Sequence, residues 1–214
     1  MVVGGCAHVA RVEQEPATEP SFTDYLHALP EGYFAHYFPV GASTIQRDQA
    51  VATFDPEHEY IELSTKNTVS GTAHWAMKVL KTNEGEDLLL ISDMIQNEVS
   101  NQRLYVVEKN QAGEWSDRTQ EYFDGVMGAA AQLNLKERVT NEYPAGEVGT
   151  KLKNAKFIFS PESPDIIAGI GNVWQMEFPL YIITWDGNSF MLSDTVPGEQ
   201  EGSTDATDTA ETVE

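Results

Sequence analysis

The chain has 214 residues and a single Cys, and its 34 Asp and Glu residues outnumber its 13 Lys and Arg residues, giving a net charge of −21. A chain of this length buries a hydrophobic core without disulfides or a structural metal ion, and one Cys excludes an internal disulfide framework. The negative charge argues against nucleic-acid binding through a basic surface and against attachment to an anionic membrane by charge alone.

The charge is distributed unevenly, which predicts three segments. Residues 197–214 contain six acidic residues and no basic residue, so we expect a disordered acidic tail there. Residues 1–20 end in a polar, Pro-containing stretch and are expected to form a flexible tether. Residues 21–196 contain 25 acidic and 12 basic residues, a net charge of −13, and are expected to form one globular domain. Solubility explains this acidity better than calcium binding, because no D-x-[DN]-x-[DN]-G loop is present.

A short motif precedes the tether: the aliphatic Val3, the small residues Gly4 and Gly5, and then Cys6. It resembles the lipobox of bacterial lipoproteins, in which a signal peptidase cleaves before the Cys and the thiol receives a diacylglycerol group. The resemblance implies that Cys6 becomes the mature N-terminus and that its acyl chains insert into a lipid bilayer. A signal peptide carries about 7–15 apolar residues before such a site, whereas only Met1 to Val3 precede the small residues here. The alternative is a free thiol in a disordered segment.

A short helix is expected over residues 22–28, where Ser21 is placed to cap the first turn and Pro30 follows the last. The stretch that follows it is rich in aromatic side chains. These are Tyr33, Phe34, Tyr37 and Phe38. We consider two roles for them: closing one end of the hydrophobic core, or forming an exposed recognition strip for a glycan, a peptide or a partner protein.

An antiparallel meander is predicted from about residue 59 to residue 109 by alternating or continuous apolar patterns. Its strands are expected at residues 60–65, 72–80, 88–91 and 104–107. Within 72–80, the alternation places Trp75, Met77 and Val79 on the core face. The same alternation places His74 and Lys78 on the solvent-exposed face.

The second half of the body is expected to contain one helix and several short strands. Apolar residues at helical spacing, with a capping box of Asp117 and Gln120, predict a helix near 119–133. Residues 136–155 look like a loop. Strands are expected at 157–159, 166–167, 180–185 and 189–192, the last two forming a hairpin. The fold class is therefore α+β, mostly β, with an antiparallel meander, a C-terminal hairpin and one or two short helices.

Two stretches resemble a second group of proteins. The stretch from Tyr181 to Phe190 is similar to the terminal Y-x-x-x-W-[ND]-G-x-x-F hairpin of uncharacterised envelope lipoproteins of Gram-negative bacteria. Residues 104–107, leading to Trp115, resemble the strand–turn–Trp pattern of the same group. The resemblance implies an envelope location and a β-rich body, and it carries no catalytic residues.

The sequence contains no recognised catalytic or metal-binding motif. The five His residues form no H-x-H, H-E-x-x-H or Cys/His pattern. His58 and His74 lie on strands expected to be neighbours, but the pairing separates them by several residues, which disfavours a shared metal. No G-x-S-x-G motif is present, and Gly169-Ile170-Gly171 lacks the context of a dinucleotide site. We therefore assign no catalytic residue, no metal ligand and no cofactor.

These observations favour a lipid-anchored envelope protein that faces the periplasm or the cell surface. Its domain is expected to be non-enzymatic and to bind a ligand or a partner, such as an envelope protein or a glycan. The speculative ligand-binding residues are the four aromatic residues of 33–38. Two alternatives stay open: a periplasmic hydrolase with an unrecognised acid/histidine site, and a structural component of an envelope assembly.

Overall fold

The computed structural model describes residues 22–193, apart from 99, 111, 128 and 173–174. Cys6, Ser21, the expected tether and the expected acidic tail lie outside the described residues. In chain order, the elements are α1 (Phe22–Ala28), the 3-10 helix η1 (Glu31–Phe34), α2 (Thr44–Ala50), β1 (Val51–Asp55), β2 (Tyr60–Thr68), β3 (Gly71–Lys81), β4 (Asp87–Gln96), β5 (Ser100–Lys109), β6 (Trp115–Asp117), α3 (Thr119–Tyr122), α4 (Asp124–Met127), α5 (Ala129–Glu142), α6 (Ala145–Lys153), β7 (Ala155–Phe159), β8 (Ile166–Asn172), β9 (Gln175–Trp185) and β10 (Phe190–Leu192).

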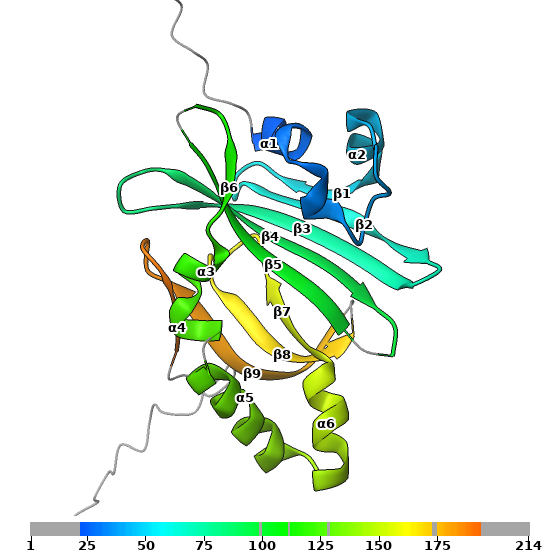
Figure 1. The fold of residues 1–214 in the computed structure, drawn as a ribbon, viewed down its shortest axis with the longest axis vertical. Coiled ribbons are helices and arrows are strands. Elements are labelled where there is room, and N and C mark those ends of the chain that lie inside the picture. Colours follow the sequence, from blue (N-terminus) through cyan, green and yellow to red (C-terminus); the bar gives the residue numbers. More distant parts are fainter. Residues whose placement is uncertain (1–21, 99, 111, 128, 173–174, 194–214) are drawn as a thin grey trace, which may run out of the picture.

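Two antiparallel sheets form the body of the molecule. The first has the order β1-β2-β3-β4-β5-β6 and the second β10-β9-β8-β7. Figure 1 shows the second sheet beneath one face of the first, while α1 and α2 lie on the opposite face. The predicted class, α+β and mostly β with an antiparallel meander, is confirmed. The C-terminal hairpin is part of the four-stranded sheet.

The register of the meander explains the burial of β3. Leu63 of β2 lies opposite Trp75, and Ile61 lies opposite Met77. Trp75 and Met77 are fully buried and Val79 is 5% exposed, so the predicted core face is correct. The turn before β3 requires Gly71, whose φ is 136° and where a Cβ atom would lie 2.4 Å from the Gln96 carbonyl oxygen.

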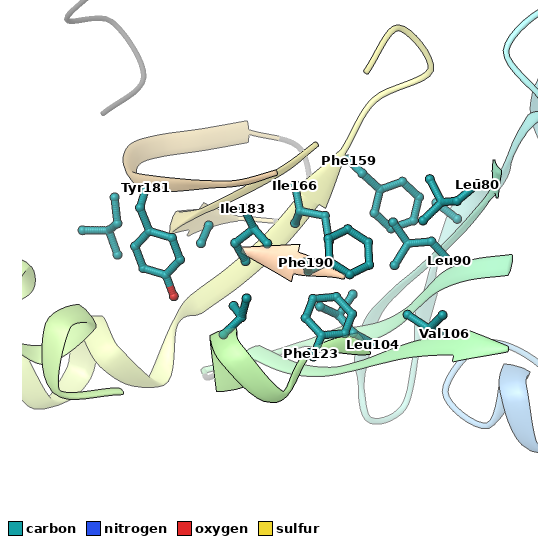
Figure 2. Close-up of a cluster of buried hydrophobic side chains, with 14 of the residues drawn as sticks. Leu80, Leu90, Leu104, Val106, Phe123, Phe159, Ile166, Tyr181, Ile183 and Phe190 are labelled. Carbon is teal, nitrogen blue, oxygen red and sulfur yellow. The ribbon is translucent and has the colours of Figure 1, made fainter. Parts of the chain in front are cut away.

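A hydrophobic core fills the space between the two sheets (Figure 2). Leu90 and Val106 of the first sheet face Ile166 and Ile183 of the second. One side of this core is closed by Phe123, which follows α3, and by Phe190 of β10. Their rings stack with centroids 4.4 Å apart. Burial of these side chains holds the second sheet against the first.

Because the second sheet covers this face, the predicted solvent exposure of Lys78 is wrong. Lys78 is 6% exposed, and its Nζ donates to the carbonyl oxygens of Ser160, Pro161 and Ser163 in the β7–β8 loop. His74 is half-buried, with Nε2 3.0 Å from Oε1 of Glu62. A buried ammonium is tolerated here because three carbonyl oxygens replace its water shell.

The expected loop at 136–155 is also wrong, because it contains the end of α5 and all of α6. The expected helix at 119–133 is divided into α3, α4 and the start of α5. Pro144 precedes α6 as its N-cap residue, with Glu147 in the first turn and Lys151 and Lys153 in the last. These charges interact favourably with the helix dipole and offset part of the helix propensity that is lost at the two Gly residues of the segment.

Candidate functional site

The four aromatic residues of the predicted recognition strip pack onto the outer face of the first sheet. Phe34 is 1% exposed and Tyr37 is 3% exposed, whereas Tyr33 and Phe38 are half-buried. The Trp75 indole Nε1 donates to the Tyr33 carbonyl oxygen at 2.8 Å, which fixes the segment above β3. The rings thus form a second core beneath α1 and α2, and Phe34 and Phe38 also border a cavity.

A column of stacked groups rises from the sheet at this position. The rings of Phe34 and Trp75 stack with centroids 4.7 Å apart and an angle of 19°. The guanidinium carbon of Arg47 lies 4.3 Å from the Phe34 centroid. Since the indole covers one face of the Phe34 ring, the guanidinium lies on the other, in a cation–π arrangement. Arg47 itself is only 5% exposed.

Arg47 lies on α2, a helix that the sequence interpretation missed. Ser43 accepts from the Gln46 backbone N–H, and the Gln46 side chain accepts from the Ser43 N–H. This is a capping box, and the S-x-x-Q signal was present in the sequence. The capping box fixes where α2 begins. Arg47 directly follows Gln46 in this helix, and its side chain points inward toward α1.

The Arg47 guanidinium is only partly satisfied by the protein. Nη1 donates to the carbonyl oxygens of Leu26 and Leu29, both at 2.8 Å, at the C-terminal end of α1. Nε is buried without a hydrogen-bond partner, and Nη2 makes no hydrogen bond with any described residue. Burial lowers the pKa of Arg47, and the Glu31 carboxylate opposes that shift. Glu31 uses Oε1 to accept the Gly41 N–H at 3.0 Å.

A cavity of about 290 Å³ opens beside this guanidinium. We call it the Arg47 cavity. Its lining is largely apolar, with Arg47 and Glu31 as the charged members and the remainder from Gly32, Phe34, Ala35, Phe38, Pro39, Val40 and Ala42. Val40 is 93% exposed at the rim. The site therefore combines a small apolar space with one buried cation.

Asp93 holds the segment that lines this cavity. It is fully buried on β4, between Trp75 and Arg103 in the strand register. Oδ2 accepts the His36 N–H at 2.9 Å, whereas Oδ1 has no hydrogen-bond partner. Burial raises the pKa of Asp93 to about 6, although the His36 N–H, Arg103 and the Tyr37 N–H stabilise the carboxylate. Burial, followed by Arg103, lowers the pKa of His36.

A larger cleft of about 440 Å³ lies beside Tyr25, Asp87 and Trp115. Its polar groups already satisfy one another. Tyr25 donates its hydroxyl to Asp87 at 2.7 Å, and Lys81 forms an ion pair with the same carboxylate. Lys109 lies 5.4 Å from the Trp115 ring centroid. This cleft is wide and polar, and its charged side chains are more exposed to water than the buried guanidinium of the Arg47 cavity.

The histidines pair with separate carboxylates. His58 Nδ1 lies 2.8 Å from Asp55, and His74 Nε2 lies 3.0 Å from Glu62. Within the described ranges, no group of three or more His, Cys, Asp and Glu side chains is arranged to hold a metal ion. The His74 Nδ1 is buried without a partner, but no hydroxyl or thiol of a described residue is hydrogen-bonded to His58 or His74.

No protein family and no curated protein matches the sequence. Among solved structures, the chain is similar to "a domain of an uncharacterized protein from Porphyromonas gingivalis W83". That similarity has a TM-score of 0.48 and 10% sequence identity, and covers 83% of this chain and 100% of the other. In the part of the chain that the structure describes, no helix is both long and apolar enough to cross a membrane.

Proposed function

We propose that this protein is a non-enzymatic ligand-binding domain and that the Arg47 cavity is its ligand site. The observation that carries the proposal is the buried guanidinium, whose Nε has no partner, in the wall of an apolar cavity. Small-molecule sites commonly combine an apolar lining with a few polar groups that still lack partners. In this chain the aromatic segment supplies the lining and α2 supplies the polar group.

The lining of the cavity favours binding over catalysis. Its acid–base group is Glu31, and one oxygen of that carboxylate already holds the Gly41 N–H. Ser43 lies beside the cavity, but its hydroxyl accepts the Gln46 N–H in the helix cap. Catalysis by a nucleophile needs a hydroxyl or thiol within hydrogen-bond reach of a base, and the lining residues offer no such pair.

The proposed location is a bacterial cell envelope, with attachment through acylated Cys6. The lipobox-like residues Val3 to Cys6 support this proposal.

Blocking the cavity tests the function. In the full chain, Ala42→Phe places a ring in the Arg47 cavity, while the exposed Ile45, which does not line it, provides the control Ile45→Phe. Ligand-detected NMR with a library of small fragments should identify binders that lose their signal with Ala42→Phe and keep it with Ile45→Phe. Fragments that bind both variants as well as the native protein would show that the cavity is not the site.

A further inference from the structure

We infer that the Arg47 cavity binds a small organic monocarboxylate, with the carboxylate on Nη2 of the Arg47 guanidinium and an apolar body against Phe34 and Phe38. The inference rests on the proposed function and specifies its ligand class. It depends on three features of the site: a buried charge without an ion pair, the position of the free donor, and the size and polarity of the space.

The first feature is a buried cation whose charge is only partly compensated, because the Glu31 carboxylate acts on it from the same cavity without forming an ion pair. Arg47 is 5% exposed, and no carboxylate of the described residues forms an ion pair with it. Its partners are carbonyl oxygens at the end of α1, which carry partial charge only. Removing a guanidinium from water is costly unless an anion or a full set of hydrogen bonds replaces the water. An anionic ligand supplies the opposite charge and a hydrogen-bond acceptor for Nη2.

The second feature is the position of the donors. Nη1 is turned toward α1 and Nε is enclosed by protein atoms, so neither is offered to a ligand. Nη2 has no hydrogen-bond partner among the described residues and is the donor left for a ligand of the cavity that Arg47 lines. A carboxylate makes a charge-assisted hydrogen bond to such a donor with both partners charged, which a hydroxyl or a neutral amide oxygen cannot.

The third feature is the space itself. At about 30 Å³ for each water-sized group, the cavity holds about ten non-hydrogen atoms. Phe38 is half-buried, and its ring lies 5.7 Å from that of Phe34, so an apolar group has an aromatic wall to contact. The Glu31 carboxylate at the cavity disfavours a dianion such as a phosphate monoester. Phenylacetate and octanoate match these limits in size and charge.

The test compares each acid with its neutral isostere on the full chain at pH 7.5, by titration calorimetry: phenylacetate against phenylacetamide, and octanoate against octanamide. The acid should bind about ten- to a hundredfold more tightly, which is the usual gain from a hydrogen bond to a charged group. Equal binding of acid and amide, abolished by Ala42→Phe, would overturn the carboxylate inference and leave the cavity as the ligand site. If neither binds and no fragment is sensitive to Ala42→Phe, both proposals fail.

Two variants change the charge at the site in opposite directions. Arg47→Gln should remove the preference for the acid, and its melting temperature must be checked because Arg47 also satisfies carbonyls of α1. Glu31→Gln keeps an oxygen for the Gly41 N–H and should strengthen acid binding about threefold without changing amide binding. Glu142→Gln, on α5, makes the same change in net charge elsewhere and should change neither. Acid binding that is unaffected by Glu31→Gln would contradict the placement of the carboxylate.

Discussion

The Asp93 carboxylate should make folding stability depend on pH in a direction opposite to that of most carboxyl groups. In the folded protein, burial raises the pKa of Asp93 from 3.8 to about 6. The folded state therefore holds the Asp93 proton more tightly than the unfolded chain does. The stability that Asp93 contributes is fully present below pH 3.8, and it is lost as the pH rises through 6.

The size of the effect follows from the pKa difference and the burial. Asp93 is fully buried, so solvent does not screen it, and the difference of about 2 between its folded and unfolded pKa corresponds to about 3 kcal/mol. Asp93→Asn removes the titration but keeps a carbonyl oxygen that can accept the His36 N–H. Its amide nitrogen takes the position of Oδ1, which has no hydrogen-bond partner in the native protein.

Urea unfolding, followed by Trp fluorescence from pH 4 to pH 7.5, measures the difference in unfolding free energy between the Asp93→Asn variant and the native protein. This difference should rise in favour of the variant by about 2.5 kcal/mol over that range, with nearly all of the change between pH 4 and pH 6 and none above about pH 7. Other titrating groups are common to both proteins and cancel. A difference independent of pH would refute the reasoning, and would mean that Arg103 or ordered water compensates the buried charge.

The remaining predictions concern the core and the attachment. Trp75→Ala should lower the unfolding free energy by about 3–5 kcal/mol, because the indole is fully buried and stacked on Phe34. Trp115→Ala, at a half-buried ring, is the matched control and should cost clearly less in the same urea experiment, so equal losses would contradict the assigned core. Cys6→Ser in the full-length precursor should move the protein from the membrane to the soluble fraction, as measured by fractionation and immunoblotting. An unmodified Cys6 thiol in the mass spectrum of the native protein would exclude lipidation.

Alternation along a strand predicted which side chains of β3 face the core, but not whether the other face is covered. The pattern Trp75, Met77, Val79 identified one buried face correctly. Lys78 reads as a solvent-facing residue on any periodicity argument. It is buried because the β7–β8 loop brings three carbonyl oxygens to its Nζ from more than 80 residues away. A long-range contact of this kind leaves no trace in the local pattern.

The helices from α3 to α6 were less predictable for a different reason. Two Gly residues and Pro144 within 136–155 indicated a loop, and single-residue propensities favour that interpretation. In the structure Pro144 precedes the first helical residue, where its missing N–H costs nothing, and Val139 of α5 is fully buried. In α6, which contains both Gly residues, Val148 and Leu152 pack partly buried against the core, and such tertiary contacts offset propensities that differ by about 1 kcal/mol for each Gly.

The candidate site shows where a sequence interpretation loses information. The aromatic residues were identified, since four rings within six positions are visible in any reading of the chain. Arg47 was not identified, although Ser43 and Gln46 form a capping-box pattern that predicts a helix start just before it. What makes Arg47 unusual is the set of donors left unused once Nη1 has bonded to the α1 carbonyls and the ring of Phe34 has covered one face. A single charged residue on a short helix is ordinarily solvated, so its identity alone predicts nothing. The chemistry proposed for this cavity depends on which hydrogen bonds of Arg47 the folded protein leaves unmade. Those bonds are known only when the partner of each nitrogen has been identified in the structure.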